Sequence, residues 1–295
     1  MLLEGIRTPF LNAVFGMITR LGEETVAVVI LCAVFWCINK RIAYIIGIAY
    51  FLSGLTVQGM KICFRIDRPW ITDPALAPVP SALAGATGYS FPSGHTQSAA
   101  ALFGSIATQT KRIPAIAGCL LLIILVAFSR MYLGVHTPLD VIASLLISLI
   151  FILLTIRFFA GRPAGNKRQL VLSVFMVGYA IAALVLALTL YANGTIEMSY
   201  ADDCLKAAGA GVGFAAGMYI ERVYIDFSVR AKNIFLQILK LVIGIAGAFV
   251  IKEGLALLFG GGLAVDMLRY FLALLWVTAL FPLIIKRFFA LPPAQ

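Results

Sequence analysis

Apolar runs of membrane-spanning length follow one another along most of the chain, and short polar segments separate them. An α-helix needs about 20 mainly apolar residues to cross a bilayer, because it rises only about 1.5 Å per residue. The apolar runs lie at residues 25–38, 42–62, 95–110, 113–130, 138–157, 170–192, 206–220, 234–251 and 267–285. This pattern predicts an all-α fold, a polytopic membrane helix bundle of about nine transmembrane helices.

Three further segments have patterns of their own. Residues 2–20 mix apolar residues with spaced charges, which favours an N-terminal helix that lies flat in the membrane interface. Residues 64–92 are rich in Pro, Ala and Gly and form the longest polar connection, which we expect to roof or flank a site. Residues 209–217 read GAGVGFAAG, and glycines at this spacing predict a flat helix face for close helix packing.

The composition supports the membrane interpretation and argues against a nucleic-acid partner. Hydrophobic residues make up 62% of the 295 residues and charged residues only 12%, with a mean hydropathy of +1.01. Soluble domains carry about 25% charged residues. The formal net charge is +10, yet no Lys/Arg run is interleaved with aromatic residues, so we expect no nucleic-acid partner. The scattered cysteines predict neither a disulfide framework nor a metal site.

The basic residues predict an orientation in the membrane. When the predicted spans cross in alternation, most Lys and Arg residues fall on one side, including those at 40–41, 111–112 and 157–168. Basic connections are retained in the cytoplasm. We therefore expect a cytoplasmic C-terminus, an extracytoplasmic position for both histidines, and a location in the plasma membrane.

Ionisable residues gather at this extracytoplasmic level. Lys61, Arg68 and Arg130 lie near the predicted ends of spans, as do His95 and His136, the only two histidines of the chain. Such groups are costly at membrane depth unless they face a cavity and find partners, so the cluster indicates a functional site. Arg offers paired donors that match phosphate oxygens, and Lys adds a compact charge. The three cations therefore predict a pocket for a phosphate group.

Ser93 and Gly94 are predicted to open the third span, directly before His95. The free N–H groups and the positive end of a helix favour an anion. Glycine also lets the backbone approach a ligand closely. Both residues are therefore candidate phosphate contacts.

His136 is the candidate nucleophile. A neutral imidazole can attack phosphorus, and Asp140 four residues on can hold its far nitrogen if the segment is helical. In a competing interpretation the segment is simply a helix start, with Thr137 as N-cap, Pro138 as first helical residue and Asp140 completing a capping box. The two roles can coexist. His95 is then available as general acid for the leaving oxygen.

Three separate patterns in the chain resemble the motifs of one known family. They read KICFRIDRP at Lys61–Pro69, PSGH at Pro92–His95 and SRMYLGVHTPLD at Ser129–Asp140. In type and order they are similar to the motifs of the type 2 phosphatidic acid phosphatase superfamily, which includes glucose-6-phosphatases and vanadium haloperoxidases. The motifs span residues 61–140, and the family's helical core would extend over about 25–160.

The resemblance implies metal-independent hydrolysis of a phosphate ester through a phosphohistidine. It implies that His136 is the nucleophile, oriented by Asp140, and that His95 is the acid for the leaving group. The phosphate ligands that it implies are Lys61, Arg68, Ser93, Gly94 and Arg130. We expect no cofactor and no metal, and the sequence contains no HExxH pattern.

The resemblance also suggests how the chain is organised. Residues 1–160 are expected to form the phosphatase core, with the interfacial helix and five spans, and residues 161–295 an accessory bundle of about four spans. The leading hypothesis is a membrane phosphatase that acts at the extracytoplasmic face on a lipid phosphate or diphosphate, such as phosphatidate, phosphatidylglycerophosphate or a polyprenyl diphosphate. The alternatives are a phosphatase for a soluble sugar phosphate, a lipid phosphotransferase, and a transporter whose cationic pocket binds an anion.

Overall fold

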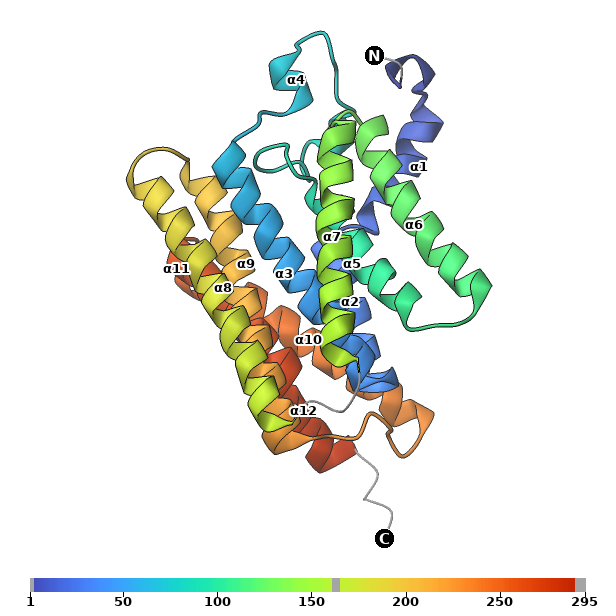
Figure 1. Ribbon diagram of the computed structural model, residues 1–295, viewed down its shortest axis with the longest axis vertical. Coiled ribbons are helices and arrows are strands. Elements are labelled where there is room, and N and C mark those ends of the chain that lie inside the picture. The colour runs from blue at the N-terminus through green and yellow to red at the C-terminus, as the bar shows by residue number, and fades with distance from the viewer. Residues whose placement is uncertain (1–2, 161–164, 290–295) are drawn as a thin grey trace. The chain divides into compact units, whose positions relative to one another are not determined.

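The computed structural model describes residues 3–160 and 165–289, and the regular elements in these ranges are all helical. Figure 1 labels the α-helices. Their bounds are α1 Pro9–Arg20, α2 Glu24–Ala33, α3 Lys40–Phe64, α4 Pro69–Thr72, α5 Gly94–Thr108, α6 Ile113–Tyr132, α7 Pro138–Phe159, α8 Asn166–Ala192, α9 Met198–Ile220, α10 Ile234–Phe259, α11 Leu263–Leu275 and α12 Phe281–Ile284. The all-α prediction is therefore confirmed for the described residues.

Shorter helical turns extend or connect these helices. Two 3₁₀ turns lie at Glu4–Ile6 and Pro80–Ala82. Four π-helical turns follow α2, α9, α11 and α12, at Val34–Ile38, Glu221–Ile225, Trp276–Leu280 and Ile285–Phe289. Helix starts follow ordinary capping chemistry, because the side chains of Thr8 and Asn233 accept from the backbone N–H three residues on.

Helices occupy all of the predicted span positions, but fewer of them meet the requirements of a membrane span. Within the described residues, six helices are long and apolar enough to cross a membrane, or seven if α1 and α2 with its π turn form one bent span. The helix α5 has only 15 residues. The helix α9 has 23 but is rich in Gly and Ala and carries Asp202, Asp203 and Lys206 near its start. These two helices and α2, which qualifies only as part of the bent pair, account for the difference from the predicted number of about nine.

The chain divides into two compact units. The first unit contains Met1–Val28 and Ile48–Arg157, and the second contains Val29–Gly47 and Phe158–Gln295. All residues of the predicted site lie in the first unit. The helix α3 is shared, since its first turns belong to the second unit and the remainder to the first.

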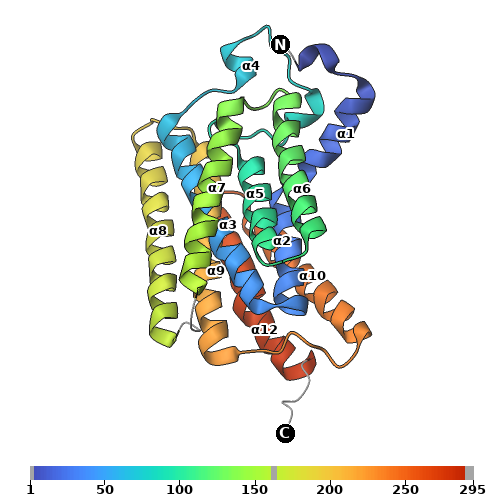
Figure 2. The same ribbon diagram turned by 45° about the vertical axis from the view of Figure 1, so that its right-hand side comes forward.

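In the first unit, α5 lies between α6 and α7, as Figures 1 and 2 both show. Buried polar contacts hold this arrangement. Gln97 of α5 donates to the carbonyl of Tyr50 at 3.1 Å and to Ser53 Oγ at 2.7 Å, both on α3. Ser148 of α7 donates to the carbonyl of Gln97. Because such groups are costly to bury without partners, these contacts specify how the three helices pack.

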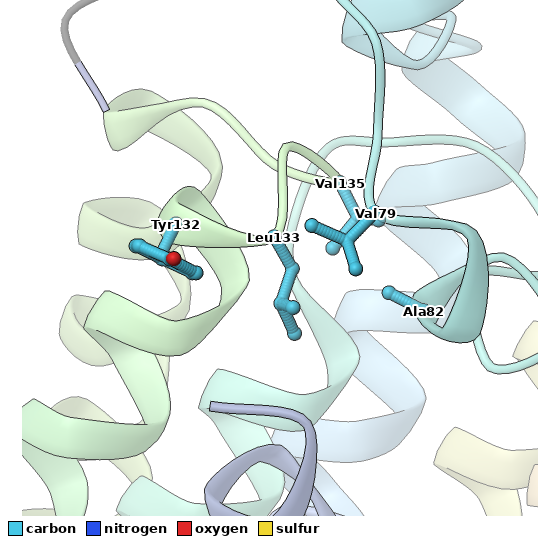
Figure 3. Close-up of a cluster of buried hydrophobic side chains, with 5 residues drawn as sticks. All are labelled: Val79, Ala82, Tyr132, Leu133 and Val135. Atoms are coloured by element: carbon cyan, nitrogen blue, oxygen red, sulfur yellow. The ribbon is translucent and has the colours of Figure 1, made fainter. Parts of the chain in front are cut away.

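The long connection between α4 and α5 is anchored on a small hydrophobic cluster (Figure 3). The cluster consists of Val79, Ala82, Tyr132, Leu133 and Val135. The amide of Val79 also donates to the carbonyl of Leu133 at 3.0 Å. The connection is thereby fixed to the turn between α6 and α7, which carries His136.

In the second unit, α9 and α11 pack closely, as the glycine spacing predicts. A Cβ atom at Gly209 would lie 2.2 Å from the carbonyl oxygen of Met267, and one at Gly213 would lie 2.3 Å from that of Phe271. A Cβ atom at Gly217 would overlap the side chain of Thr278, in the π turn that follows α11. Only glycine therefore permits this approach of the two backbones.

Candidate active site

Three regions of the first unit carry the predicted site residues. Lys61 is in the last turn of α3, and Arg68 directly precedes α4. Ser93, Gly94 and His95 form the start of α5. Arg130, His136 and Asp140 come from the end of α6, the following turn and the first turn of α7.

The imidazole of His136 lies between a carboxylate and a guanidinium. Its Nδ1 is 3.3 Å from Asp140 Oδ2, and its Nε2 is 2.9 Å from Arg68 Nη1. Arginine has donors only, so Nε2 must be the acceptor, and a carboxylate accepts from Nδ1. These two contacts assign the proton of the neutral ring to Nδ1 and leave the lone pair on Nε2, on the side of the cations.

Asp140 combines the two roles that the sequence left open. Its Oδ2 faces His136 and also accepts from the backbone N–H of Thr137 at 2.8 Å, while Thr137 Oγ1 accepts from the amide of Asp140 at 3.3 Å. This reciprocal pair is a capping box at the start of α7. Ser90 Oγ adds a third donor to the same oxygen at 2.6 Å. Capping and orientation of the imidazole thus use one carboxylate.

Arg68 ties the polar connection to the turn that carries the imidazole. Its Nε donates to the carbonyl of Gly88 at 3.0 Å and its Nη2 to that of Thr87 at 2.6 Å. Its Nη1 donates to the carbonyl of Val135 at 2.9 Å, besides facing His136. The connection therefore flanks the site, as its length and composition predict.

Arg130 is almost completely buried, with 1% of its surface exposed. Its Nη1 donates to Thr19 Oγ1 of α1 at 2.8 Å. Its Nε and Nη2 are buried and have no hydrogen-bond partner among the residues that the structure describes. A buried guanidinium with unmatched donors is suited to bind an anion, because the unmatched donors are otherwise costly.

The three cations act together on the histidines. Burial is the main cause that holds the pKa of His136 well below its usual value, and the charges of Arg68, Arg130 and Lys61 lower it further. The hydrogen bond to Asp140 opposes this shift. The same cations lie within electrostatic reach of His95. The neutral, nucleophilic form of His136 is therefore favoured at neutral pH.

The start of α5 faces open space on one side. Ser93 is the N-cap residue, and its Oγ accepts from the amide and the hydroxyl of Thr96 at 3.4 and 3.0 Å. A Cβ atom at Gly94 would meet nothing within 4 Å. The first amides of the helix, at Gly94 and His95, precede its ladder of hydrogen bonds. A Cβ atom at Gly85 would lie 3.9 Å from Nε2 of His95, so the connection passes beside this ring.

Sequence reasoning missed three residues that contact the site. Ser90 holds Asp140, Thr19 holds Arg130, and Gly22 packs so closely that its Cβ would lie 2.6 Å from the carbonyl oxygen of His95. Ser90 lies two residues before the PSGH motif, and a hydroxyl next to this motif was an available signal. Thr19 lies in the N-terminal segment of residues 2–20 and Gly22 follows shortly after it, and neither position gave such a signal.

The arrangement combines an oriented imidazole, a second histidine and three cations around the start of a helix. This set can neutralise a phosphate group, attack it and protonate a leaving oxygen. Within residues 3–160 and 165–289, no group of three or more His, Cys, Asp or Glu side chains could hold a metal ion.

Comparisons with known proteins agree with the motifs. Residues 40–164 match the PAP2 superfamily, and residues 205–292 match the transmembrane extension of PAP2 superfamily phosphatases. The chain is similar to phosphatidylglycerophosphatase B of Bacillus subtilis (strain 168), with 31% identity over 171 residues that cover 50% of this chain and 75% of that protein. No solved structure matches the chain. The resemblance read from the three motifs is confirmed, and the chain belongs to the PAP2 superfamily as an integral membrane phosphatase, a hydrolase of phosphate esters.

Proposed function

We propose that this protein hydrolyses a lipid phosphate or diphosphate monoester at the extracytoplasmic face of the membrane, through a phosphohistidine at His136. One observation carries the proposal. The proton of His136 is held on Nδ1 by Asp140, and Nε2 points its lone pair at the guanidinium of Arg68. A phosphate group that Arg68 binds would therefore stand directly in front of the nucleophilic nitrogen.

In the first step, the phosphate displaces His136 from Arg68 and accepts donors from the pocket. The proposed phosphate ligands are the side chains of Lys61, Arg68, Ser93 and Arg130 and the backbone amide of Gly94. Nε2 attacks phosphorus, the bond to the leaving oxygen breaks, and the cations stabilise the charge on the equatorial oxygens. The phosphorylated imidazole is a cation, which the carboxylate of Asp140 stabilises.

In the same step, His95 gives its proton to the departing oxygen. The negative charge of the bound phosphate favours the protonated form of His95 against the three cations. Water then attacks phosphorus and passes its proton to His95, and the N–P electron pair returns to Nε2. Phosphate leaves, and both histidines regain their starting protonation states. The charge stabilisation in this scheme comes from side chains and needs no metal.

Two observations support a lipid substrate. The phosphatase is an integral membrane protein with six or seven candidate spans among its described residues, and its Bacillus subtilis relative is named for a phospholipid phosphate. A substrate whose tails stay in the bilayer could present its headgroup to this pocket without leaving the membrane. A soluble sugar phosphate and a non-water acceptor are competing outcomes of the test below.

The proposal includes a topology. The basic connections favour a cytoplasmic C-terminus and an extracytoplasmic active site in the plasma membrane. Helices at every predicted position support the proposal of about nine crossings, with α1 in the interface. Residues 1–160 would form the phosphatase core and residues 161–295 the accessory bundle. Reporter fusions at the connections between helices would test each side.

The central experiment is phosphate release by the full chain, purified in detergent micelles. The substrates are phosphatidylglycerophosphate, phosphatidate, a polyprenyl diphosphate and glucose 6-phosphate, each with and without a chelator. We expect turnover of at least one lipid substrate, unchanged by the chelator. Substitution His136→Ala should abolish turnover and leave the amount of membrane-inserted protein unchanged.

Three results would contradict the proposal in different ways. Rapid turnover of hexose phosphate without turnover of any lipid would establish the soluble substrate. Transfer of labelled phosphate to an added lipid alcohol in place of water would establish a phosphotransferase. Retained turnover in the His136→Ala variant would remove the proposed nucleophile.

A further inference from the structure

The helix α1 contacts a residue of the proposed phosphate pocket, although α1 lies outside both ranges that match the superfamily. Thr19, in its last turn, is 7% exposed, and its Oγ1 accepts from Arg130 Nη1 at 2.8 Å. The two residues are 111 positions apart in the sequence. The contact therefore depends on how α1 packs against the end of α6.

Several contacts fix α1 on α6. The hydroxyl of Tyr132 donates to Asn12 Oδ1 at 3.1 Å, and Arg7 Nε donates to the carbonyl of Tyr132 at 2.9 Å. The ring of Phe15 packs on that of Tyr132 with a centroid distance of 4.4 Å. Directly after α1, Gly22 touches the backbone of His95. These contacts determine both the rotation and the height of α1, so the hydroxyl of Thr19 is held in place.

The contact leaves one edge of the guanidinium available. Nη1 of Arg130 is engaged by Thr19, whereas Nε and Nη2 are buried without a partner in the described chain. Nε and Nη2 form the side edge of the planar group, with two parallel N–H donors at the spacing of two phosphate oxygens. Anchoring the opposite corner fixes the plane and hence the direction in which this edge points.

We infer that Thr19 is a positioning residue, whose hydroxyl orients Arg130 so that its Nε and Nη2 edge meets the phosphate. The inference rests on the proposed function of the site, because it assumes that Arg130 binds phosphate. Thr19 itself does not touch the substrate. It acts only through the guanidinium, so α1 helps to orient a pocket residue that comes from α6.

The test compares substitutions that keep either the hydroxyl or the volume of Thr19. Thr19→Val keeps the shape and removes the acceptor, and Thr19→Ser keeps the acceptor. Thr155→Val is the matched control, since Thr155 is a 3% exposed helical threonine in α7 whose hydroxyl donates to a backbone carbonyl of its own helix at 2.7 Å. The readouts are the Kd for inorganic phosphate by calorimetry on the full chain in detergent, and KM and kcat for the hydrolysed substrate.

We expect Thr19→Val to raise the Kd for phosphate and the KM by about tenfold, the value of one hydrogen bond to a charged group. Thr19→Ser should stay within about twofold of the parent, as should Thr155→Val. A merely structural role would reduce the active fraction, and so the apparent kcat, but would leave Kd and KM unchanged. That result, or equal effects of Thr19→Val and Thr155→Val, would overturn the inference.

A double-mutant cycle tests whether the effect passes through Arg130. In an Arg130→Lys background, Thr19→Val should cause no further loss of phosphate affinity, because the guanidinium that Thr19 orients is absent. An undiminished loss would contradict the inference. If Thr19→Val does not fold, Thr19→Ala and Thr19→Ser decide by the same criteria.

The outcomes separate this inference from the proposed function. A parent enzyme that binds phosphate but turns over no ester rejects the proposed function, while the ratio of Kd values still decides the role of Thr19. A parent enzyme that hydrolyses lipid phosphates with equal KM in all Thr19 variants rejects the inference alone. A parent that neither binds phosphate nor hydrolyses esters rejects both.

Discussion

The guanidinium of Arg68 donates from Nη1 to Nε2 of His136 at 2.9 Å. The nitrogen that we propose as nucleophile is therefore unprotonated and already faces the cation that we propose as a phosphate ligand. In the proposed mechanism, an anionic phosphate oxygen replaces the neutral imidazole as the acceptor of the charged guanidinium, and a contact between opposite charges is the stronger one. In this mechanism, the substrate binds and the nucleophile is released in the same event.

Substitution Asp140→Asn should lower kcat about 10²-fold or more. An amide in place of the carboxylate can donate to Nδ1 and so favours the ring tautomer with its proton on Nε2, which cannot attack phosphorus. It also removes the charge that stabilises the phosphorylated ring. Initial rates at saturating substrate, normalised to inserted protein, measure the effect. A loss of less than about tenfold would exclude this role of Asp140.

Substitution Ser90→Ala should lower kcat about five- to tenfold. Ser90 Oγ donates to Asp140 Oδ2 at 2.6 Å, and the alanine variant leaves that buried carboxylate with one donor fewer to orient it. Ser144→Ala is the matched control. Ser144 is equally buried, but its hydroxyl donates at 2.8 Å to the backbone carbonyl of Asp140 and not to the carboxylate. Equal rates for the two variants would contradict the prediction.

The acid limb of the pH profile of kcat/KM should lie below the usual histidine pKa of about 6.5. Burial and the charges of Arg68, Arg130 and Lys61 lower the pKa of His136, so the ring stays neutral at a more acidic pH than a free histidine. Substitution Lys61→Gln removes one of these charges. The pKa of His136 should then rise, and the acid limb should move to higher pH.

The parent enzyme and the Lys61→Gln variant are assayed with the same substrate. The ionisation of the substrate therefore contributes equally to the two pH profiles. Arg65→Gln serves as control, because Arg65 is exposed and is not among the charges that shift the pKa of His136. A limb that moves to lower pH in Lys61→Gln, or that moves equally in Arg65→Gln, would show that Lys61 does not act through charge on His136.

Substitution Gly213→Ala should destabilise the second unit by about 1–3 kcal/mol, the usual effect of overpacking. The new methyl group would lie 2.3 Å from the carbonyl oxygen of Phe271, so α9 and α11 would have to separate. In α8, a Cβ atom at Gly178 would meet nothing within 4 Å, and Gly178→Ala should leave Tm unchanged or slightly higher. Thermal unfolding in detergent compares the two variants, and equal Tm values would contradict the packing argument.

The sequence predicted those parts of the site that depend on local spacing. His136 and Asp140 are four residues apart at a helix start, so one face of one turn brings them together. Ser90 and Asp140 are 50 residues apart, and Thr19 and Arg130 are 111 apart. Contacts of this kind depend on the packing of separate helices, and a single threonine in an amphipathic segment gives no signal of its partner.

The helices were easier to predict than their roles as membrane spans. Apolar runs predicted helices at the right places, but α5 stops after 15 residues and α9 begins with a polar turn. A helix packed among other helices can be short or small in its side chains, because it needs no lipid-facing surface. Hydropathy alone does not distinguish such a helix from a span.

The close contact of α9 with α11 has a consequence for lipids and for motion. Gly209 and Gly213 bring the two backbones together, Gly217 packs against Thr278 in the π turn after α11, and the seam leaves no room for a hydrocarbon tail. If the substrate is a lipid, as we propose, its tail would reach the enzyme by some other path than this seam. The two helices should also tilt and shift together as one rigid body when the second unit adapts to a bilayer of different thickness.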